Sequence, residues 1–363
     1  MSEFFNIFKN EAFFCGTAEP RADFYAEVKE LIQQTLSQAP ADYTPVWFRF
    51  HVSDIANQED ILRRVLADTN CRCAVAIVGQ APLCGAHAGL EAYFVQGKVT
   101  CPETDMSAVE SGPYTHLFFN TRELTTRGSG PQMNEEFLAA EKIIASRGGN
   151  IPENLQRTWI YCRDIDNNYA DLVTARKDLF TQWGMTADTH YITSTGIEGS
   201  AHPHYRLVRM DSMALFGHAP EQIQYLYAPE HLSPTHIYGV TFERGTRIIY
   251  GDRSHYYISG TASIDKNGQV VHLQDVEKQT LRLLENVDAL MKEGGGSIAD
   301  LTQAIIYLRD PADYERVKKI IDSALPATAA RLIVRGSICR PTWLVEMDAI
   351  GANACGDTRF APL

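Results

Sequence analysis

The chain contains an internal repeat whose period is the size of a small domain. Residues 148–164 read GGNIPENLQRTWIYCRD and residues 294–310 read GGGSIADLTQAIIYLRD. The second segment follows the first at a constant shift of 146 positions. Solenoids and propellers repeat every 20–50 residues or so, so this period is too long for them. It predicts a duplicated domain, in which differences between the two copies indicate where the chemistry takes place.

Both copies show the same order of expected elements: hairpin, helix, strand, helix, strand, strand. In the first copy we expect strands and helices at 116–119, 134–146, 157–162, 168–181, 189–194 and 205–213. In the second we expect them at 236–250, 254–264, 275–291, 303–308, 311–323, 328–335 and 343–350. Each first helix ends at a glycine pair, a common C-terminal stop. This order favours an α+β fold in which helices cover one face of a mixed sheet.

The N-terminal region is less clearly patterned. Helical spacing predicts one helix at 22–36. The segment 46–97 repeats only the last part of the order, with strand-like patterns at 46–52, 73–78 and 90–95 and helical spacing at 57–66. A truncated third copy would show this pattern. The polar stretch 97–112 contains Pro102 and is a candidate linker. We therefore divide the chain into an N-terminal region (1–110), a first unit (111–220) and a second unit (235–352).

Composition limits the classes of partner. The chain has 363 residues, 45% of them apolar, and a net charge of −12. The balance is that of a globular protein, and the acidic charge argues against a nucleic-acid surface or an anionic membrane. No apolar run is long enough to span a bilayer, and the first residues do not resemble a signal peptide. Eight scattered cysteines predict reduced thiols in the cytoplasm.

We find no motif that predicts a cofactor or a metal. Cys71-x-Cys73 has no second pair, and His202-x-His204 has no third ligand at useful spacing. The glycines at 294–296 close a helix, whereas a phosphate-binding loop opens one. We therefore expect a small-molecule partner only, and we expect neither metal nor cofactor.

Six short stretches of the second copy resemble the Rid superfamily, also called YjgF or L-PSP proteins. They are ISGTAS at 258–263, Gln279-x6-Asn286-Val287, IYLRD at 306–310, Ala330-Arg331-Leu332, Cys339-Arg340-Pro341 and VEMDAI at 345–350. The whole chain is similar to one branch of this superfamily, the chorismatases, through SGTASI at 259–264 and Tyr169-x6-Arg176. The hairpin DKNG at 265–268 is more similar to ordinary Rid proteins. The resemblance implies tandem units of the chorismate mutase-like, bacillus-type fold, and a homotrimer with pockets between subunits.

Glu346 is the candidate catalytic residue. In the last strand Val345, Met347 and Ala349 form the apolar side, so Glu346 faces the opposite side. The first copy has Arg209 at the matching position, which suggests specialisation of the two copies. A solvated strand carboxylate would give the same pattern, but by the resemblance this position is that of the Rid catalytic glutamate.

Arg331 is the first candidate for substrate binding. It lies fifteen positions before Glu346 and matches the Rid arginine that holds a substrate carboxylate. A guanidinium offers two parallel N–H donors, which suits a carboxylate. A salt bridge to a surface acid is the alternative. Because Arg335 and Arg340 are close, the alignment could shift to either.

Five positions complete the predicted site through the chorismatase resemblance. Tyr169 and Arg176 share one helix face, although an ordinary amphipathic helix would show the same spacing. Tyr227 and Arg244 flank the join between the copies and match further ligand residues of that branch. Ala262 would shape the pocket by its small size.

Three functions remain open on these residues. A chorismatase-like hydrolase would bind two carboxylates and deliver a proton from Glu346 to an enol ether, releasing pyruvate. A Rid-type deaminase would need one carboxylate clamp and a water held by Glu346 to hydrolyse an imine or enamine. A non-catalytic metabolite-binding protein would use the same pocket without chemistry. We favour the first, because it uses residues of both copies.

Overall fold

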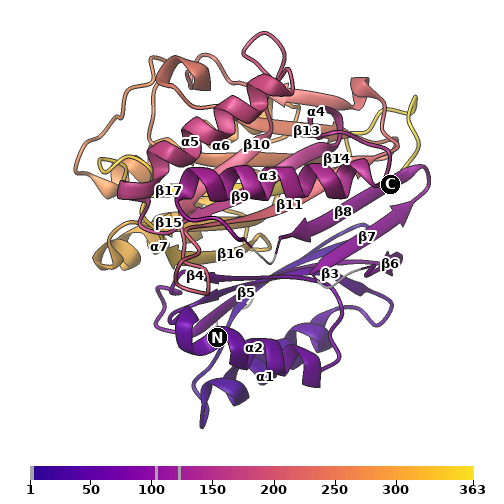
Figure 1. Ribbon diagram of the computed structural model, residues 1–363, viewed down its shortest axis with the longest axis vertical. Coiled ribbons are helices and arrows are strands. Elements are labelled where there is room, and N and C mark those ends of the chain that lie inside the picture. The colour runs from indigo at the N-terminus through magenta and orange to yellow at the C-terminus, as the bar shows by residue number, and fades with distance from the viewer. Residues whose placement is uncertain (1–3, 103–104, 122–123) are drawn as a thin grey trace.

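Three mixed β-sheets, each made by one continuous segment, form the protein (Figure 1). The computed structural model describes residues 4–102, 105–121 and 124–363. We call the segments 4–95, 98–216 and 223–353 the first, second and third units. Each unit packs two long helices against its sheet, as the α+β prediction requires. In Figure 1, α1 and α2 of the first unit lie on the outer side of its sheet, away from the other two units.

The helices and strands follow one another in the same order in all three units. The first unit comprises β1 (Phe4–Phe8), β2 (Glu11–Thr17), α1 (Phe24–Gln38), β3 (Thr44–Val52), α2 (Ile55–Asp68), β4 (Ala74–Gly79) and β5 (Ala88–Val95). The second comprises β6 (Lys98–Thr100), β7 (Met106–Ser111), β8 (Tyr114–Asn120), α3 (Ser129–Ala145), α4 (Ile151–Asn154), β9 (Leu155–Cys162), α5 (Ile165–Gln182), β10 (Thr193–Glu198) and β11 (Val208–Phe216). The third comprises β12 (Ile223–Leu226), β13 (Gly245–Ile249), β14 (Ser254–Ala262), α6 (Val276–Glu293), β15 (Leu301–Leu308), α7 (Tyr314–Ala324), β16 (Ala330–Arg335) and β17 (Val345–Asn353).

The strand orders show that the three sheets share one topology. They are β1-β2-β5-β3-β4, β6-β7-β8-β11-β9-β10 and β12-β13-β14-β17-β15-β16. The second and third sheets each carry one extra edge strand. We did not expect the hairpin of β1 and β2, whereas α1 lies close to the helix expected at 22–36. With both present, the order of the first unit is complete rather than truncated.

Two of the expected segments are wrong in detail. The candidate linker 97–112 contains β6 and β7, which extend the second sheet; its residues 103–104 lie outside the described residues. The stretch is polar in composition because β6 and β7 form a hairpin at the edge of the sheet, where few side chains need to be apolar. The strand expected at 236–250 is confined to Gly245–Ile249, because a 3-10 turn occupies Thr235–Tyr238.

The repeated glycines end the first helix of their units. Gly148 and Gly295 have φ values of 79° and 79°, the left-handed conformation that glycine adopts at little cost. Tyr161 and Tyr307 keep the shift of 146, but these two glycines differ by 147. The turn that follows is one residue longer in the second unit, where α4 has 4 residues and its counterpart at Ile298–Asp300 has 3.

The three units close into a ring through equivalent strands. β4 contacts β8, β10 contacts β14 and β16 contacts β2. Hydrogen bonds join each pair of units: Ala74 N to Ser107 Oγ at 2.7 Å, Gly260 N to Thr195 Oγ1 at 3.1 Å, and Leu83 N to Ile333 O at 3.0 Å. One chain therefore contains three equivalent interfaces between units.

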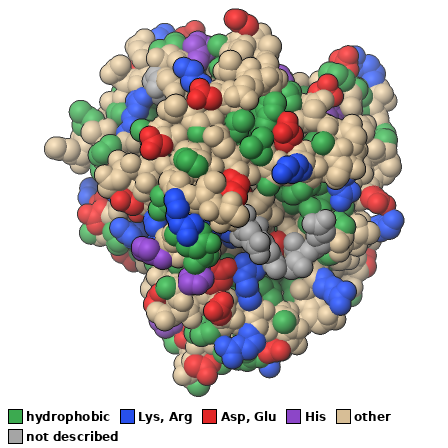
Figure 2. Space-filling model, in the orientation of Figure 1, with side chains coloured by type: hydrophobic (Ala, Val, Ile, Leu, Met, Phe, Trp, Pro, Cys, Tyr) green, Lys and Arg blue, Asp and Glu red, His purple; other side chains and the backbone are tan. Residues whose placement is uncertain are grey.

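The surface agrees with the charge argument. Figure 2 shows acidic and basic side chains interspersed on the visible face, without a continuous basic patch. Among the described residues, no helix is long and apolar enough to cross a membrane.

Candidate functional site at the interface of the second and third units

One sheet position distinguishes the three units chemically. Glu346 pairs with Tyr307 in the third sheet, and Arg209 pairs with Tyr161 in the second. The register confirms that Arg209 takes the place of Glu346. In the first sheet the same position is Gly89, which pairs with His51. The third unit is therefore the one that carries a carboxylate here.

Glu346 lines a cavity between the second and third units. The second unit supplies residues of α5 and β10, and the third supplies β14, β17 and two loops. The lining residues are Tyr169, Arg176, Ser194, Gly196, Val240, Phe242, Arg244, Gly260, Ala262, Ile264, Cys339, Trp343 and Glu346. Five of the seven predicted site residues thus meet in one place: Glu346, Arg176, Tyr169, Arg244 and Ala262.

Burial makes Glu346 a proton donor at neutral pH. Its side chain is 5% exposed. Burial, reinforced by repulsion from Asp348, raises its pKa to about 8, against the opposing effects of Arg244 and Arg157. A carboxyl group with this pKa holds its proton near pH 7, which general acid catalysis requires.

Gly260 leaves the room that the carboxylate occupies. A Cβ atom added at this residue would lie 2.3 Å from Oε1 of Glu346 and 3.2 Å from Cγ2 of Thr195. Because a real Cβ contact is never that short, only a glycine on β14 allows Glu346 to keep its position. The glycine of the SGTAS stretch at 259–263 is therefore required for the observed position of the Glu346 side chain.

Buried ion pairs surround the site where the three sheets face one another. Arg49 of the first unit contacts Glu91 at 3.2 Å and Asp211 at 2.9 Å. Arg157 lies 3.4 Å from Asp348, which also accepts a hydrogen bond from Tyr307 at 3.0 Å. Burial raises the pKa of Asp348 as well, whereas Arg49 and His51 lower the pKa of Glu91 against the effect of its burial.

The cationic residues of the cavity come from two units. Arg176 on α5 is 2% exposed, and Arg244, just before β13, is 4% exposed. Arg244 donates to the carbonyl oxygen of Ser233 at 2.9 Å, which fixes its guanidinium at the mouth of the cavity. Two guanidinium groups next to one protonated acid suit a ligand with two carboxylates.

The cavity is nearly closed. It holds about 30 Å³ of open space, which is room for about one water. A second cavity of about 380 Å³ adjoins it and shares Phe242 and Arg244 with it. A ligand of several carbon atoms therefore requires movement of the segment 240–244, which lies between the two cavities.

Two predicted residues lie elsewhere. Arg331 points to the interface of the third and first units, where its Nε is 3.0 Å from Asp322 and its guanidinium lies 4.1 Å from the ring centre of Phe4. The fifteen-residue spacing does not bring the side chains of Arg331 and Glu346 together in this fold. Tyr227 lines the adjoining cavity and is 45% exposed.

Sequence reasoning missed several lining residues. Ser194 and Gly196 belong to β10, and no sequence signal connects that strand with the third unit, because the contact arises from the ring of units. Trp343 donates to the carbonyl oxygen of Ser263 at 3.0 Å. Burial raises the pKa of the Cys339 thiol to about 12. Cys339 belongs to the family-like stretch 339–341, and Trp343 lies between that stretch and 345–350. The resemblance therefore indicated their position but not their role.

The fold and site together define a protein of three fused α+β units with a ligand cavity between two of them. A crystal structure of a chorismatase shares this fold over 97% of this chain and 99% of that chain, with a TM-score of 0.67 and 18% identity. The Rid family protein YyfA from Yersinia pestis matches 36% of this chain with 99% of its own, at 22% identity and a TM-score of 0.32.

Sequence comparison identifies the family. The endoribonuclease L-PSP family matches residues 249–353, which make up most of the third unit. The 3-aminoacrylate deaminase RutC of Acinetobacter baylyi is 34% identical over 95 residues, 26% of this chain and 75% of RutC. The chain belongs to the Rid (endoribonuclease L-PSP) superfamily.

Proposed function

We propose that this protein hydrolyses the enol ether of chorismate and releases pyruvate. The observation that carries the proposal is Glu346, a buried acid with its pKa raised to about 8, in a cavity that also holds Arg176 and Arg244. Chorismate presents two carboxylates and one enol ether. Two guanidinium groups and one proton donor match those three groups.

The residues divide the reaction between them. Arg176 and Arg244 each bind a carboxylate, and their combined positive charge is offset by the ligand, so Glu346 stays protonated. Glu346 delivers its proton to the methylene carbon of the enol ether, and an oxocarbenium-like carbon results. Water adds to that carbon and gives one proton to Glu346. The bond between that carbon and the ether oxygen then breaks, and the remaining proton of the added water passes to the ether oxygen, which leaves as the ring hydroxyl. Pyruvate and a cyclohexadiene acid leave.

A coupled assay tests this proposal. Purified protein is mixed with chorismate, and pyruvate is followed through lactate dehydrogenase. We expect release by the wild type and loss of at least 100-fold in Glu346→Gln, in keeping with removal of a general acid. Arg331→Gln is the matched control, because its guanidinium lies at another interface. Pyruvate release no faster than in Glu346→Gln would exclude the hydrolase.

A second candidate is supported by the relation to RutC, which is named a 3-aminoacrylate deaminase. An enamine or imine acid needs one arginine for its carboxylate and one water beside Glu346, and both fit the same cavity. The test generates a 2-imino acid with an amino-acid oxidase and follows ammonia. Ammonia release unchanged by the protein would count against a deaminase. Binding of chorismate without turnover of either substrate would instead indicate a metabolite-binding protein.

Every residue that lines the cavity belongs to this one chain. The Rid resemblance implies a homotrimer with pockets between subunits, but here the second and third units take the place of two subunits. We propose that a single chain suffices for activity, and a native mass near 40.6 kDa would support this.

A further inference from the structure

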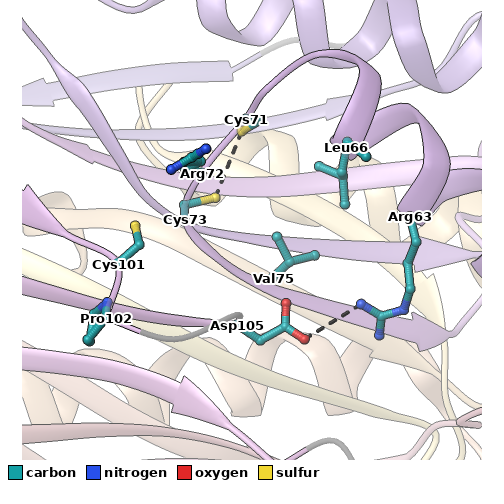
Figure 3. Close-up of a pocket in the computed structure, with 10 residues that line it drawn as sticks. Arg63, Leu66, Cys71, Arg72, Cys73, Val75, Cys101, Pro102 and Asp105 are labelled. Atoms are coloured by element: carbon teal, nitrogen blue, oxygen red, sulfur yellow. Dashed lines mark hydrogen bonds and ion pairs between the residues drawn. The ribbon is translucent and has the colours of Figure 1, made fainter.

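Another cavity, separate from the two described above, lies between the first and second units. This interface is equivalent to the one that holds Glu346. It measures about 460 Å³ and is lined by α2, the segment before β4 and the segment after β6 (Figure 3). Leu66 stands eleven residues after the start of α2, as Arg176 does in α5. Val75 is the second residue of β4, as Ser194 is of β10. The two cavities therefore use the same positions of the fold with different chemistry.

At the interface of the third and first units, a side chain occupies the equivalent place. A Cβ atom at Gly89 would lie 2.7 Å from Cδ2 of Leu332, so this leucine fills the space opposite the sheet position of Glu346. The cavity of Glu346 and the cavity between the first and second units therefore differ in the groups that line them.

Three thiols distinguish the cavity of the first two units. The sulfur atoms of Cys71 and Cys73 are 4.0 Å apart, and Figure 3 shows them pointing toward each other. Cys71 is half-buried, Cys73 is 7% exposed, and Cys101 is exposed on the opposite wall. The two sulfurs are 4.0 Å apart, and a disulfide requires them to approach to about 2.05 Å.

Arg72 offers a positive charge at this cavity, whereas Arg63 is already paired with two carboxylates. Arg63 is held by Glu59 at 2.6 Å and by Asp105 at 3.6 Å. Arg72 stands between the two cysteines in the sequence and is exposed at the cavity. Its guanidinium is placed to bind a carboxylate of an incoming molecule.

We propose that Cys71 and Cys73 are a redox-active dithiol that small disulfides bearing carboxylates, of the glutathione disulfide type, oxidise to an intramolecular disulfide. The Cys71 thiolate attacks one sulfur of the reagent, the reagent's S–S bond breaks, and one thiolate leaves. Cys73 then loses its proton to solvent and attacks the Cys71 sulfur, so the second thiolate leaves. Two protein thiols and one disulfide give one protein disulfide and two small thiols.

The second step should be slow at neutral pH and faster above it. Burial raises the pKa of Cys73 well above its usual value. The mixed disulfide on Cys71 should therefore accumulate first at pH 7 and convert to the internal disulfide as the pH rises.

The experiment treats the reduced full-length protein with glutathione disulfide, blocks the remaining thiols by alkylation and maps the peptides. Trypsin cuts after Arg72, so peptides carrying Cys71 and Cys73 stay joined only through a disulfide. Cys84 shares the second peptide, and Cys84→Ser removes that ambiguity. We expect the 71–73 link in wild type and Cys84→Ser, and a stable mixed disulfide on Cys71 in Cys73→Ser. If Cys73→Ser fails to fold, Cys71→Ser should leave Cys73 unmodified.

The exposed thiols Cys84 and Cys355 are internal controls. We expect Cys71 to react at least fivefold faster than either of them. Arg72→Gln should slow the reaction with glutathione disulfide several-fold and leave the reaction with uncharged hydroxyethyl disulfide unchanged. Equal rates at Cys71, Cys84 and Cys355, or a link from Cys71 to Cys101 instead of Cys73, would overturn the proposal.

Discussion

If Glu346 keeps its proton to about pH 8, the stability of the fold must depend on pH in a way that Glu346→Gln removes. The pKa of this carboxyl is 4.5 in the unfolded reference and about 8 in the fold. Between these values the folded state holds a proton that the unfolded state has lost. Stability is therefore full below pH 4.5, falls as the pH rises and levels off above pH 8.

The size of the effect follows from the shift. One pKa unit corresponds to about 1.4 kcal/mol, so the wild type should lose about 5 kcal/mol relative to Glu346→Gln across this range. Glutamine has nearly the same shape and does not titrate, so the difference between the two proteins isolates the carboxyl group. Titrating groups that do not interact with Glu346 contribute equally to both proteins and cancel, whereas Asp348, which repels Glu346, adds to the difference.

Urea unfolding measures this difference. The free energy of unfolding is determined by tryptophan fluorescence and far-UV circular dichroism from about pH 5 to about pH 9 for both proteins. Glu230→Gln, at a side chain that is 83% exposed, is the matched control and should run parallel to the wild type. Parallel curves for wild type and Glu346→Gln would refute the argument, because they would mean that Glu346 is ionised in the fold. A carboxylic-acid carbonyl band at pH 7 that disappears in Glu346→Gln gives an independent infrared check.

Four further outcomes are expected. Gly260→Ala should displace Glu346, with at least a tenfold loss of pyruvate release and a stability loss of about 1–3 kcal/mol on thermal unfolding, and unchanged turnover would contradict the clash. Arg244→Gln should raise KM for chorismate by about 10- to 100-fold with a smaller change in kcat, as expected for a charged hydrogen bond worth about 1.5–3 kcal/mol; an unchanged KM would remove Arg244 from the binding site. Arg331→Gln should keep kcat/KM within about twofold, since Arg331 pairs with Asp322; a large loss would restore the resemblance-based role. Light scattering should give a monomer near 40.6 kDa, and a mass three times larger would support the trimer.

Two kinds of feature could be predicted from the sequence: helices and strands with a clear local periodicity, and units whose sequence is repeated. The repeat around Tyr161 and Tyr307 predicted two units of equal order, and periodicity located most helices to within a few residues. The first unit was harder to detect for two reasons. His51 lies where the other two units have tyrosine, and the first helix of this unit is not followed by a glycine that corresponds to Gly148. Edge strands such as β6 were missed because three-residue strands leave almost no pattern.

The site was predictable where one strand or helix carries the signal. Glu346 and Arg176 follow from alternation and helical spacing joined to the family motif. Residues such as Gly196 and Ser194 were not predictable, because they reach the cavity only through packing of β10 against β14. The predicted role of Arg331 depends on packing in the same way. Its position in the sequence does not show that the packing of the units places its side chain against Phe4.

Fusion of three units into one chain explains why only one interface has this acid. In a homotrimer a residue change alters all three interfaces at once, because every subunit has the same sequence. Here the same sheet position holds Gly89, Arg209 and Glu346 in turn, so each interface changes independently. Leu332 fills the interface of the third and first units, thiols line the cavity of the first and second, and the acid lies between the second and third. The central ion pairs join residues of different units, as Arg49 does with Asp211, so loss of one unit would leave buried charges unpaired in another. Arg157 of the second unit is among the charges that act on the pKa of Glu346, so the electrostatic environment of this acid depends on a unit other than its own.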